Sequence, residues 1–159
     1  MIPKVTPFLW FDDNAEEAAN LYVSLFPNSR ILNVVRTPDG MTGNESKVMI
    51  VAFELDGAKF TALNGGPIFK FNEATSFVIR CADQAEVDHF WDGLIADGGQ
   101  QSQCGWLKDR FGLSWQVVPD ALPRLMSDPD RVKAGRVMQA MMKMGKIIVA
   151  DLEAAYNQQ

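Results

Sequence analysis

Apolar positions in the first part of the chain recur at strand and helix spacings, in the order β-α-β-β-β. Residues 5–11 form an apolar run of strand length, and a helix is expected next, because Asn14 and Glu17 match a capping pair. The apolar stripe of this helix consists of Ala18, Leu21, Tyr22, Leu25 and Phe26. Strands are predicted over residues 30–37, 47–55 and 58–64, separated by turns at 38–40 and 56–57.

The same pattern recurs after residue 70. A strand is predicted over residues 76–82, and Asp83 with Glu86 repeats the cap pair at the spacing of Asn14 and Glu17. The stripe of the second helix consists of Val87, Phe90, Trp91, Leu94 and Ile95. Strands are expected over residues 100–103, 105–108 and 113–118, with a turn at 109–112. The order and spacing indicate an internal duplication.

The character of the chain changes after Pro119. Three helices are predicted here. The first covers residues 121–126, the second is capped by Asp128 and ends at Gly145, and the third covers residues 149–156. The apolar stripe of the middle helix consists of Val132, Val137, Met138, Met141 and Met142. The methionines at 138, 141, 142 and 144 are interpreted as the buried face of this tail, with a dimer contact as the alternative. We therefore expect an α+β protein with a C-terminal α-helical appendage. It is predicted to be a single domain over residues 1–159, with repeat one at about 1–70, repeat two at about 71–119 and a helical tail at 120–159.

Composition narrows the function classes. Hydrophobic residues make up 47% of the chain and charged residues 22%, which is typical of a folded globular protein. The net charge of −5 argues against nucleic-acid and anionic-membrane partners, and no apolar run reaches the roughly 20 residues of a membrane helix. Cys81 and Cys104 form no CxxC motif and fit reduced packing thiols; with no signal peptide at the N-terminus, a cytoplasmic protein is expected. The single histidine, His89, is predicted on the polar face of the second helix.

Four segments carry a resemblance to a known family. They are residues 7–11 (PFLWF), 64–67 (NGGP), 86–91 (EVDHFW) and above all 104–119 (CGWLKDRFGLSWQVVP). Together with the duplicated units, they resemble the PhnB-like branch of the vicinal oxygen chelate superfamily, which includes glyoxalase I, extradiol dioxygenases, and fosfomycin and bleomycin resistance proteins. The resemblance implies two sheets that curl into a mixed-sheet cup, a ligand on its concave side, and a homodimer. It also implies the inherited family name 3-demethylubiquinone-9 3-methyltransferase.

Alternation along the strands assigns residues to the two faces of such a cup. The strand residues expected to face the ligand are Thr6, Phe8, Trp10, Ser76, Val78, Arg80, Ser114, Gln116 and Val118. The residues that alternate with them are expected to lie under a helix: Val5, Pro7, Leu9, Phe11, Phe77, Ile79, Cys81, Trp115 and Val117.

Metal-binding members of the superfamily place His or Glu ligands at four strand positions. The corresponding residues here are Thr6 (or Pro7), Asn64, Ser76 and Gln116. Hydroxyls and amides are not the ligands that transition metals prefer, and they carry no charge to offset a dication. We therefore expect no bound metal and no cofactor. The Gln116 amide either has its hydrogen bonds satisfied within the sheet or is a polar group that binds a ligand.

Arg80 is a cation predicted to lie in an apolar setting. It either forms an ion pair with an acid such as Glu54 or Asp109, or clamps an anionic ligand. Three aromatic residues form either the walls of the ligand site or plain core: Trp10, Phe53 and Trp106.

The favoured hypothesis is a metal-free small-molecule-binding protein or a cofactorless enzyme, with an anionic ligand if Arg80 is a clamp. The predicted ligand-binding residues are Thr6, Phe8, Trp10, Asn64, Ser76, Arg80, Trp106 and Gln116. A metal-dependent glyoxalase- or dioxygenase-like enzyme is an alternative, which requires Glu54, Asp56 or Glu73 in the cup. Methyl transfer is a third hypothesis; the chain lacks the glycine-rich loop between a first strand and a helix that usually holds the methyl donor.

Overall fold

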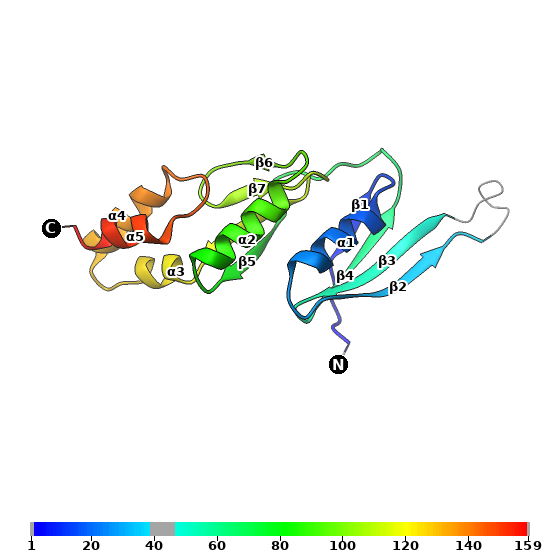
Figure 1. The fold of residues 1–159 in the computed structure, drawn as a ribbon, viewed down its shortest axis with the longest axis horizontal. Coiled ribbons are helices and arrows are strands. Elements are labelled where there is room, and N and C mark those ends of the chain that lie inside the picture. The colour runs from blue at the N-terminus through cyan, green and yellow to red at the C-terminus, as the bar shows by residue number, and fades with distance from the viewer. Residues whose placement is uncertain (1, 39–46, 159) are drawn as a thin grey trace. The chain divides into compact units, whose positions relative to one another are not determined.

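The computed structural model describes residues 2–38 and 47–158, so the predicted turn at 38–40 falls largely outside the described residues. The chain divides into two compact units, residues 1–71 and 72–159, and each is described by itself (Figure 1). Among the described residues, no helix is both long and apolar enough to cross a lipid bilayer.

The first unit contains one helix and a four-stranded sheet. Its elements are β1 (Phe8–Phe11), α1 (Ala15–Leu25), β2 (Arg30–Arg36), β3 (Val48–Leu55) and β4 (Ala58–Asn64). The strand order is β1-β4-β3-β2, with β1 parallel to β4 and the other pairs antiparallel, and α1 lies across one face (Figure 1). Asp56 and Gly57 form the predicted hairpin turn; both have positive φ, 45° and 86°, as a two-residue turn between twisted strands requires.

The second unit begins with the same arrangement. Its elements are β5 (Ser76–Cys81), α2 (Gln84–Ile95), β6 (Gln100–Gln101), β7 (Trp106–Lys108) and β8 (Ser114–Pro119). The strand order is β5-β8-β7-β6, again with the first and last strands of the unit parallel. The predicted α+β fold with duplicated β-α-β-β-β units is therefore confirmed.

The predicted cap of α2 is confirmed in detail. The Asp83 carboxylate accepts a hydrogen bond from the Glu86 amide at 3.0 Å, and the Glu86 carboxylate accepts one from the Ala82 amide at 3.0 Å. These bonds satisfy backbone donors that the first turn of a helix leaves without partners. The apolar stripe of α2 is also confirmed, because Val87, Phe90 and Trp91 are buried.

Three helices complete the second unit: α3 (Ala121–Met126), α4 (Arg131–Met141) and α5 (Val149–Tyr156). The predicted cap of α4 is wrong by two residues, because Asp130, not Asp128, accepts hydrogen bonds from the Val132 and Lys133 amides. The Asp128 carboxylate is used elsewhere: it accepts the Tyr156 hydroxyl at 2.6 Å and the Asp130 amide at 2.8 Å.

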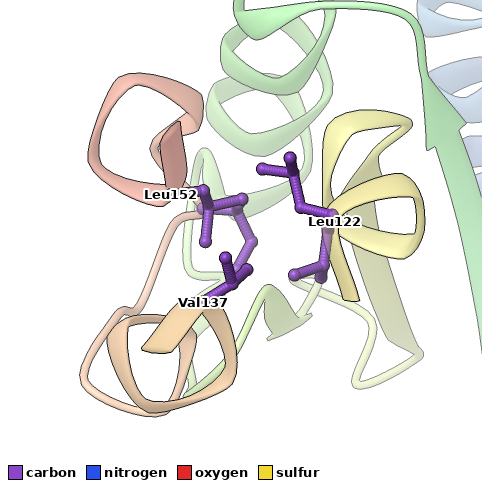
Figure 2. Packing of buried hydrophobic residues seen from close by; sticks show 5 residues of the cluster. Leu122, Val137 and Leu152 are labelled. Carbon is purple, nitrogen blue, oxygen red and sulfur yellow. The ribbon is translucent and has the colours of Figure 1, made fainter. Parts of the chain in front are cut away.

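The tail helices enclose a small apolar core of their own. Its buried residues are Leu122, Leu125, Val137, Ile147 and Leu152, and Figure 2 shows the side chains of three of them converging from α3, α4 and α5. The predicted stripe of α4 is partly wrong, since Val132, Met138 and Met142 are 69%, 47% and 58% exposed. Apolar residues occupy more than one side of α4, so periodicity does not select the buried side; packing against α3 and α5 does.

Candidate functional site

Each sheet has one face under a helix and one open face. In β1, Leu9 and Phe11 are buried while Phe8 is 59% exposed; in β5, Ile79 and Cys81 are buried while Val78 is 62% exposed. The predicted alternation is therefore confirmed within the strands. It fails before residue 8, because β1 begins at Phe8: Thr6 precedes the strand, and Val5, expected under a helix, is 87% exposed.

Trp10 is held on the open face of the first sheet. Its indole Nε1 donates a hydrogen bond to the Gly66 carbonyl at 2.9 Å, and its ring meets Phe69 edge-on at 5.0 Å between centroids. A Cβ on Gly65 would lie only 2.3 Å from the indole, so the chain after β4 can pass this ring only with glycine at that position. Phe53, in contrast, is fully buried and stacks on Phe60, so it belongs to the core rather than to a ligand wall.

Asn64 lies on the helix side of the first sheet, not on the open face where a ligand-binding residue is expected. Strand alternation groups it with the buried residues Phe60 and Ala62. Its side-chain oxygen accepts a hydrogen bond from the Ala15 amide at 2.8 Å, and its Nδ2 donates to the Val48 carbonyl at 3.0 Å. Asn64 therefore caps α1 from a distant strand, whereas the predicted cap residue, Asn14, makes no side-chain capping bond.

This cap leads to a stability prediction. Replacing Asn64 with alanine is expected to destabilise the first unit by about 1–2 kcal/mol, because a helix N–H and a strand carbonyl both lose their partner. Replacing Asn14 with alanine is expected to cost less than about 0.5 kcal/mol by the same reasoning. Urea unfolding of the two variants checks the contrast, and equal losses would contradict the assigned cap.

The open face of the second sheet carries a row of polar side chains. In the strand register Ser76 pairs with Ser114, Ser114 with Lys108, and Lys108 with Gln100, so one polar residue from each strand lies in line across the sheet. We call these four residues the polar row. In the next register position, Gln116 pairs with Trp106 and with Val78. The Gln116 side-chain amide donates to the Ser76 hydroxyl at 2.9 Å. The structure thus brings together three predicted site residues, Ser76, Trp106 and Gln116.

A cavity of about 140 Å³ lies beside the polar row. Its lining residues, all from the second unit, are Glu73, Gln100, Gln101, Ser102, Trp106, Leu107, Lys108 and Ser114. The ammonium of Lys108 forms an ion pair with the Glu73 carboxylate, and the hydrogen bond in this pair lowers the pKa of Glu73. The pair therefore persists at neutral pH and is lost as the pH falls through that lowered pKa.

Ser114 is the most unusual group at this cavity. The residue is 1% exposed, and among the described residues its hydroxyl oxygen has no hydrogen-bond partner. Buried polar atoms without a partner are rare, because leaving one unsatisfied costs about 1–3 kcal/mol. Sequence alternation placed Ser114 on the ligand side, but only the strand register shows that it lies between Lys108 and Ser76.

Arg80 forms an ion pair, but with neither of the acids considered from the sequence. Its Nε donates to the Asp120 carboxylate at 2.7 Å, and this hydrogen bond raises the pKa of the guanidinium. Glu54 pairs instead with Arg30, at 3.2 Å. Asp109 is buried, with its carboxylate bonded to Trp115 and to backbone amides of its own turn. The side chain of Arg80 remains 84% exposed on β5.

The remaining candidate groups do not converge on a metal centre. Within residues 2–38 and 47–158, no three or more His, Cys, Asp or Glu side chains are grouped to hold a metal ion. His89 is exposed on α2, as predicted. Both cysteines are free thiols; Cys81 is buried, and this burial raises its pKa to about 12.

Comparison with known proteins identifies the family. The family model described as 3-demethylubiquinone-9 3-methyltransferase matches residues 3–118. The chain belongs to this family. Within it, a PhnB protein from Bacillus cereus is 32% identical, with 74% of this chain and 99% of that chain covered and a TM-score of 0.68. The predicted place in the PhnB-like branch is therefore confirmed.

More distant structures share the fold of this PhnB-like chain. A protein from Pseudomonas aeruginosa is 18% identical, covers 74% of this chain and 98% of its own length, and has a TM-score of 0.61. The fosfomycin resistance protein FosX from Mesorhizobium loti is 13% identical, with 74% and 91% covered and a TM-score of 0.51. No curated protein matches the chain. The family match ends at residue 118, so the tail helices lie beyond it.

Proposed function

We propose that this PhnB-like protein binds a small polar molecule on the open face of its second sheet. The observation that carries the proposal is the polar row, which borders a cavity of about 140 Å³. Ligand sites commonly combine an apolar wall with a few polar groups that orient the ligand, and here Trp106 supplies the wall. A binding role of this kind needs no metal and no general base.

Three of the predicted site residues in this sheet, Ser76, Trp106 and Gln116, have a part in the proposal. Trp106 offers a flat apolar surface, and the Gln116 amide offers its oxygen while its nitrogen bonds Ser76. Lys108, absent from the sequence-based prediction, adds a positive charge. Arg80 is not required, because Asp120 already pairs with it.

Native mass spectrometry of the purified protein is the first test. It reports a retained small molecule, a bound metal ion, and the homodimer that the family resemblance implies. A library of polar metabolites is then screened by thermal shift. The binding positions of the ligands that it finds are mapped by amide NMR. We expect shifts at residues of the polar row. Ligands that perturb only the first unit would contradict the proposal.

A pair of glutamine variants sharpens this test. Gln116→Met removes the amide at nearly constant volume and is expected to weaken a mapped ligand about three- to tenfold, the contribution of a single hydrogen bond. The control is Gln139→Met, the same change at an exposed position on α4. Equal affinities of the two variants would remove Gln116 from the site.

Methyl transfer is the second candidate, favoured by the description of the family. In this chain the connection between β1 and α1 is Asp12-Asp13-Asn14, without the glycines that let a helix N-terminus approach a bound nucleotide. Titration calorimetry with S-adenosylmethionine separates the candidates. Stoichiometric binding would favour methyl transfer, and its absence together with a mapped polar ligand would favour the binding role.

A further inference from the structure

The cavity beside the polar row already holds one carboxylate that belongs to the protein. Glu73 and Lys108 are the two charged residues among those that line it. The Glu73 side chain is 60% exposed and precedes β5, whereas the Lys108 side chain is 34% exposed and is fixed within β7. Because the acid is the more exposed partner, it can exchange this contact for water at little cost. Without it, the cavity lining would carry a net charge of one positive unit.

A second, independent feature points into the same cavity. The Ser114 hydroxyl is buried, lines the cavity and lacks a hydrogen-bond partner among the residues described. Ser114 lies directly opposite Lys108 in the pairing of β7 with β8. A hydroxyl donor beside an ammonium matches the acceptor oxygens of a single carboxylate, which has about four lone-pair sites.

We propose that this cavity is a binding site for a small carboxylate, and that Glu73 occupies it in the absence of ligand. The incoming carboxylate takes the place of Glu73 on Lys108 and accepts a hydrogen bond from Ser114. This inference rests on the proposed function and narrows it to one ligand class. With a single lysine as the cation, the site fits a monoanion better than a phosphate dianion. The volume of about 140 Å³ is comparable to that of an engineered cavity of roughly 150 Å³ that binds benzene.

The test compares propionate with propionamide, which has nearly the same shape but no charge. Amide NMR titrations are run on the wild type and on Glu73→Gln, where the internal competitor is neutral. We expect propionate to shift residues of the polar row and to bind Glu73→Gln about threefold more tightly, the scale of a lost exposed ion pair. Propionamide affinity is expected to stay the same in both proteins.

Two further variants examine the groups that hold the carboxylate. Lys108→Met is expected to abolish the propionate shifts. Ser114→Ala is expected to weaken propionate about threefold without lowering the melting temperature, because it removes a hydroxyl that has no partner in the free protein. A purely structural serine would instead lose stability and leave the affinity unchanged.

The control for net charge is Asp97→Asn. Asp97 is 83% exposed and pairs with Arg110 at 3.8 Å, outside the cavity lining, and its loss changes the net charge by the same unit. We expect its propionate affinity to equal that of the wild type. Equal propionate affinities of wild type and Glu73→Gln would overturn the inference, as would shifts that survive Lys108→Met. If Lys108→Met does not fold, the Glu73→Gln comparison decides.

The outcomes also separate this inference from the proposed function. If library ligands perturb the polar row but propionate does not respond to Glu73→Gln, the carboxylate assignment fails and the binding role stands. If neither propionate nor any library ligand perturbs the polar row, both fail.

Discussion

Replacing Asp109 with alanine is expected to destabilise the second unit by about 4 kcal/mol. Asp109 is only 3% exposed, and its carboxylate is the centre of the turn between β7 and β8. One oxygen accepts the Phe111 and Leu113 amides at 2.9 and 3.1 Å, and the other accepts the Trp115 indole N–H at 2.9 Å. Alanine leaves three donors without this acceptor, and hydrogen bonds to a charged group contribute about 1.5–3 kcal/mol each. Relaxation of the turn and water that enters the vacated position are expected to recover part of that sum.

Asp109→Asn is the matched variant. Its amide oxygen can still accept the two backbone N–H groups, but its NH2 group would face the indole N–H, so two donors would meet. We expect Asp109→Asn to lower the free energy of unfolding by about half as much as Asp109→Ala does. Urea unfolding followed by tryptophan fluorescence measures both. A loss below about 1 kcal/mol for Asp109→Ala would show that this carboxylate does not hold the turn.

Asp109 also positions the proposed site. Lys108 and Ser114 flank the turn that it organises, and they pair with each other across β7 and β8. Asp109→Asn is therefore expected to bind propionate more weakly than the wild type under conditions where both proteins are folded, because a displaced turn moves Lys108 and Ser114. This dependence connects a stability determinant in the core with the open face of the sheet.

Replacing Leu152 with alanine is expected to destabilise the second unit by about 3 kcal/mol. Leu152 is fully buried in the tail core, where it meets Leu122 and Val137 (Figure 2). The alanine removes apolar contacts and leaves a cavity, and both terms lower the free energy of unfolding. The measurement is urea unfolding, with hydrogen exchange at α2 and α5.

The tail is expected to unfold together with α2 rather than to fray. The Gln84 side chain donates to the Ile147 carbonyl at 3.0 Å and accepts the Val149 amide at 2.7 Å, and Lys146 pairs with Asp88 at 3.0 Å. Loss of the tail core therefore reaches α2 through these bonds. Exchange that accelerates only in α5 of Leu152→Ala would contradict this coupling.

Met142→Ala is the control for this prediction. Met142 is 58% exposed, although its sequence position suggested a buried stripe. We expect the free energy of unfolding to change by less than about 0.5 kcal/mol, as at most surface positions. If Met142→Ala lowered the free energy of unfolding as much as Leu152→Ala does, the surface at the end of α4 would have to be covered in solution.

The amino-acid sequence by itself determined the elements, their order and the duplication. The apolar stripe of α2, the Asp83–Glu86 cap and the turn at Asp56-Gly57 are local signals, because the groups that interact lie within a few residues of one another. Strand alternation is equally local, so it correctly separated buried Ile79 from exposed Val78.

Only the tertiary structure decided which distant residues meet. The cap of α1 comes from Asn64, 49 residues away from the amide that it accepts, and Arg80 pairs with Asp120 rather than with Glu54 or Asp109. The polar row requires the register of four strands, because a shift of one residue in any pair would move its side chain to the opposite face. The sequence fragment Leu113-Ser114-Trp115 thus predicts a strand, while the position of the Ser114 hydroxyl beside Lys108 depends on hydrogen bonding between β7 and β8.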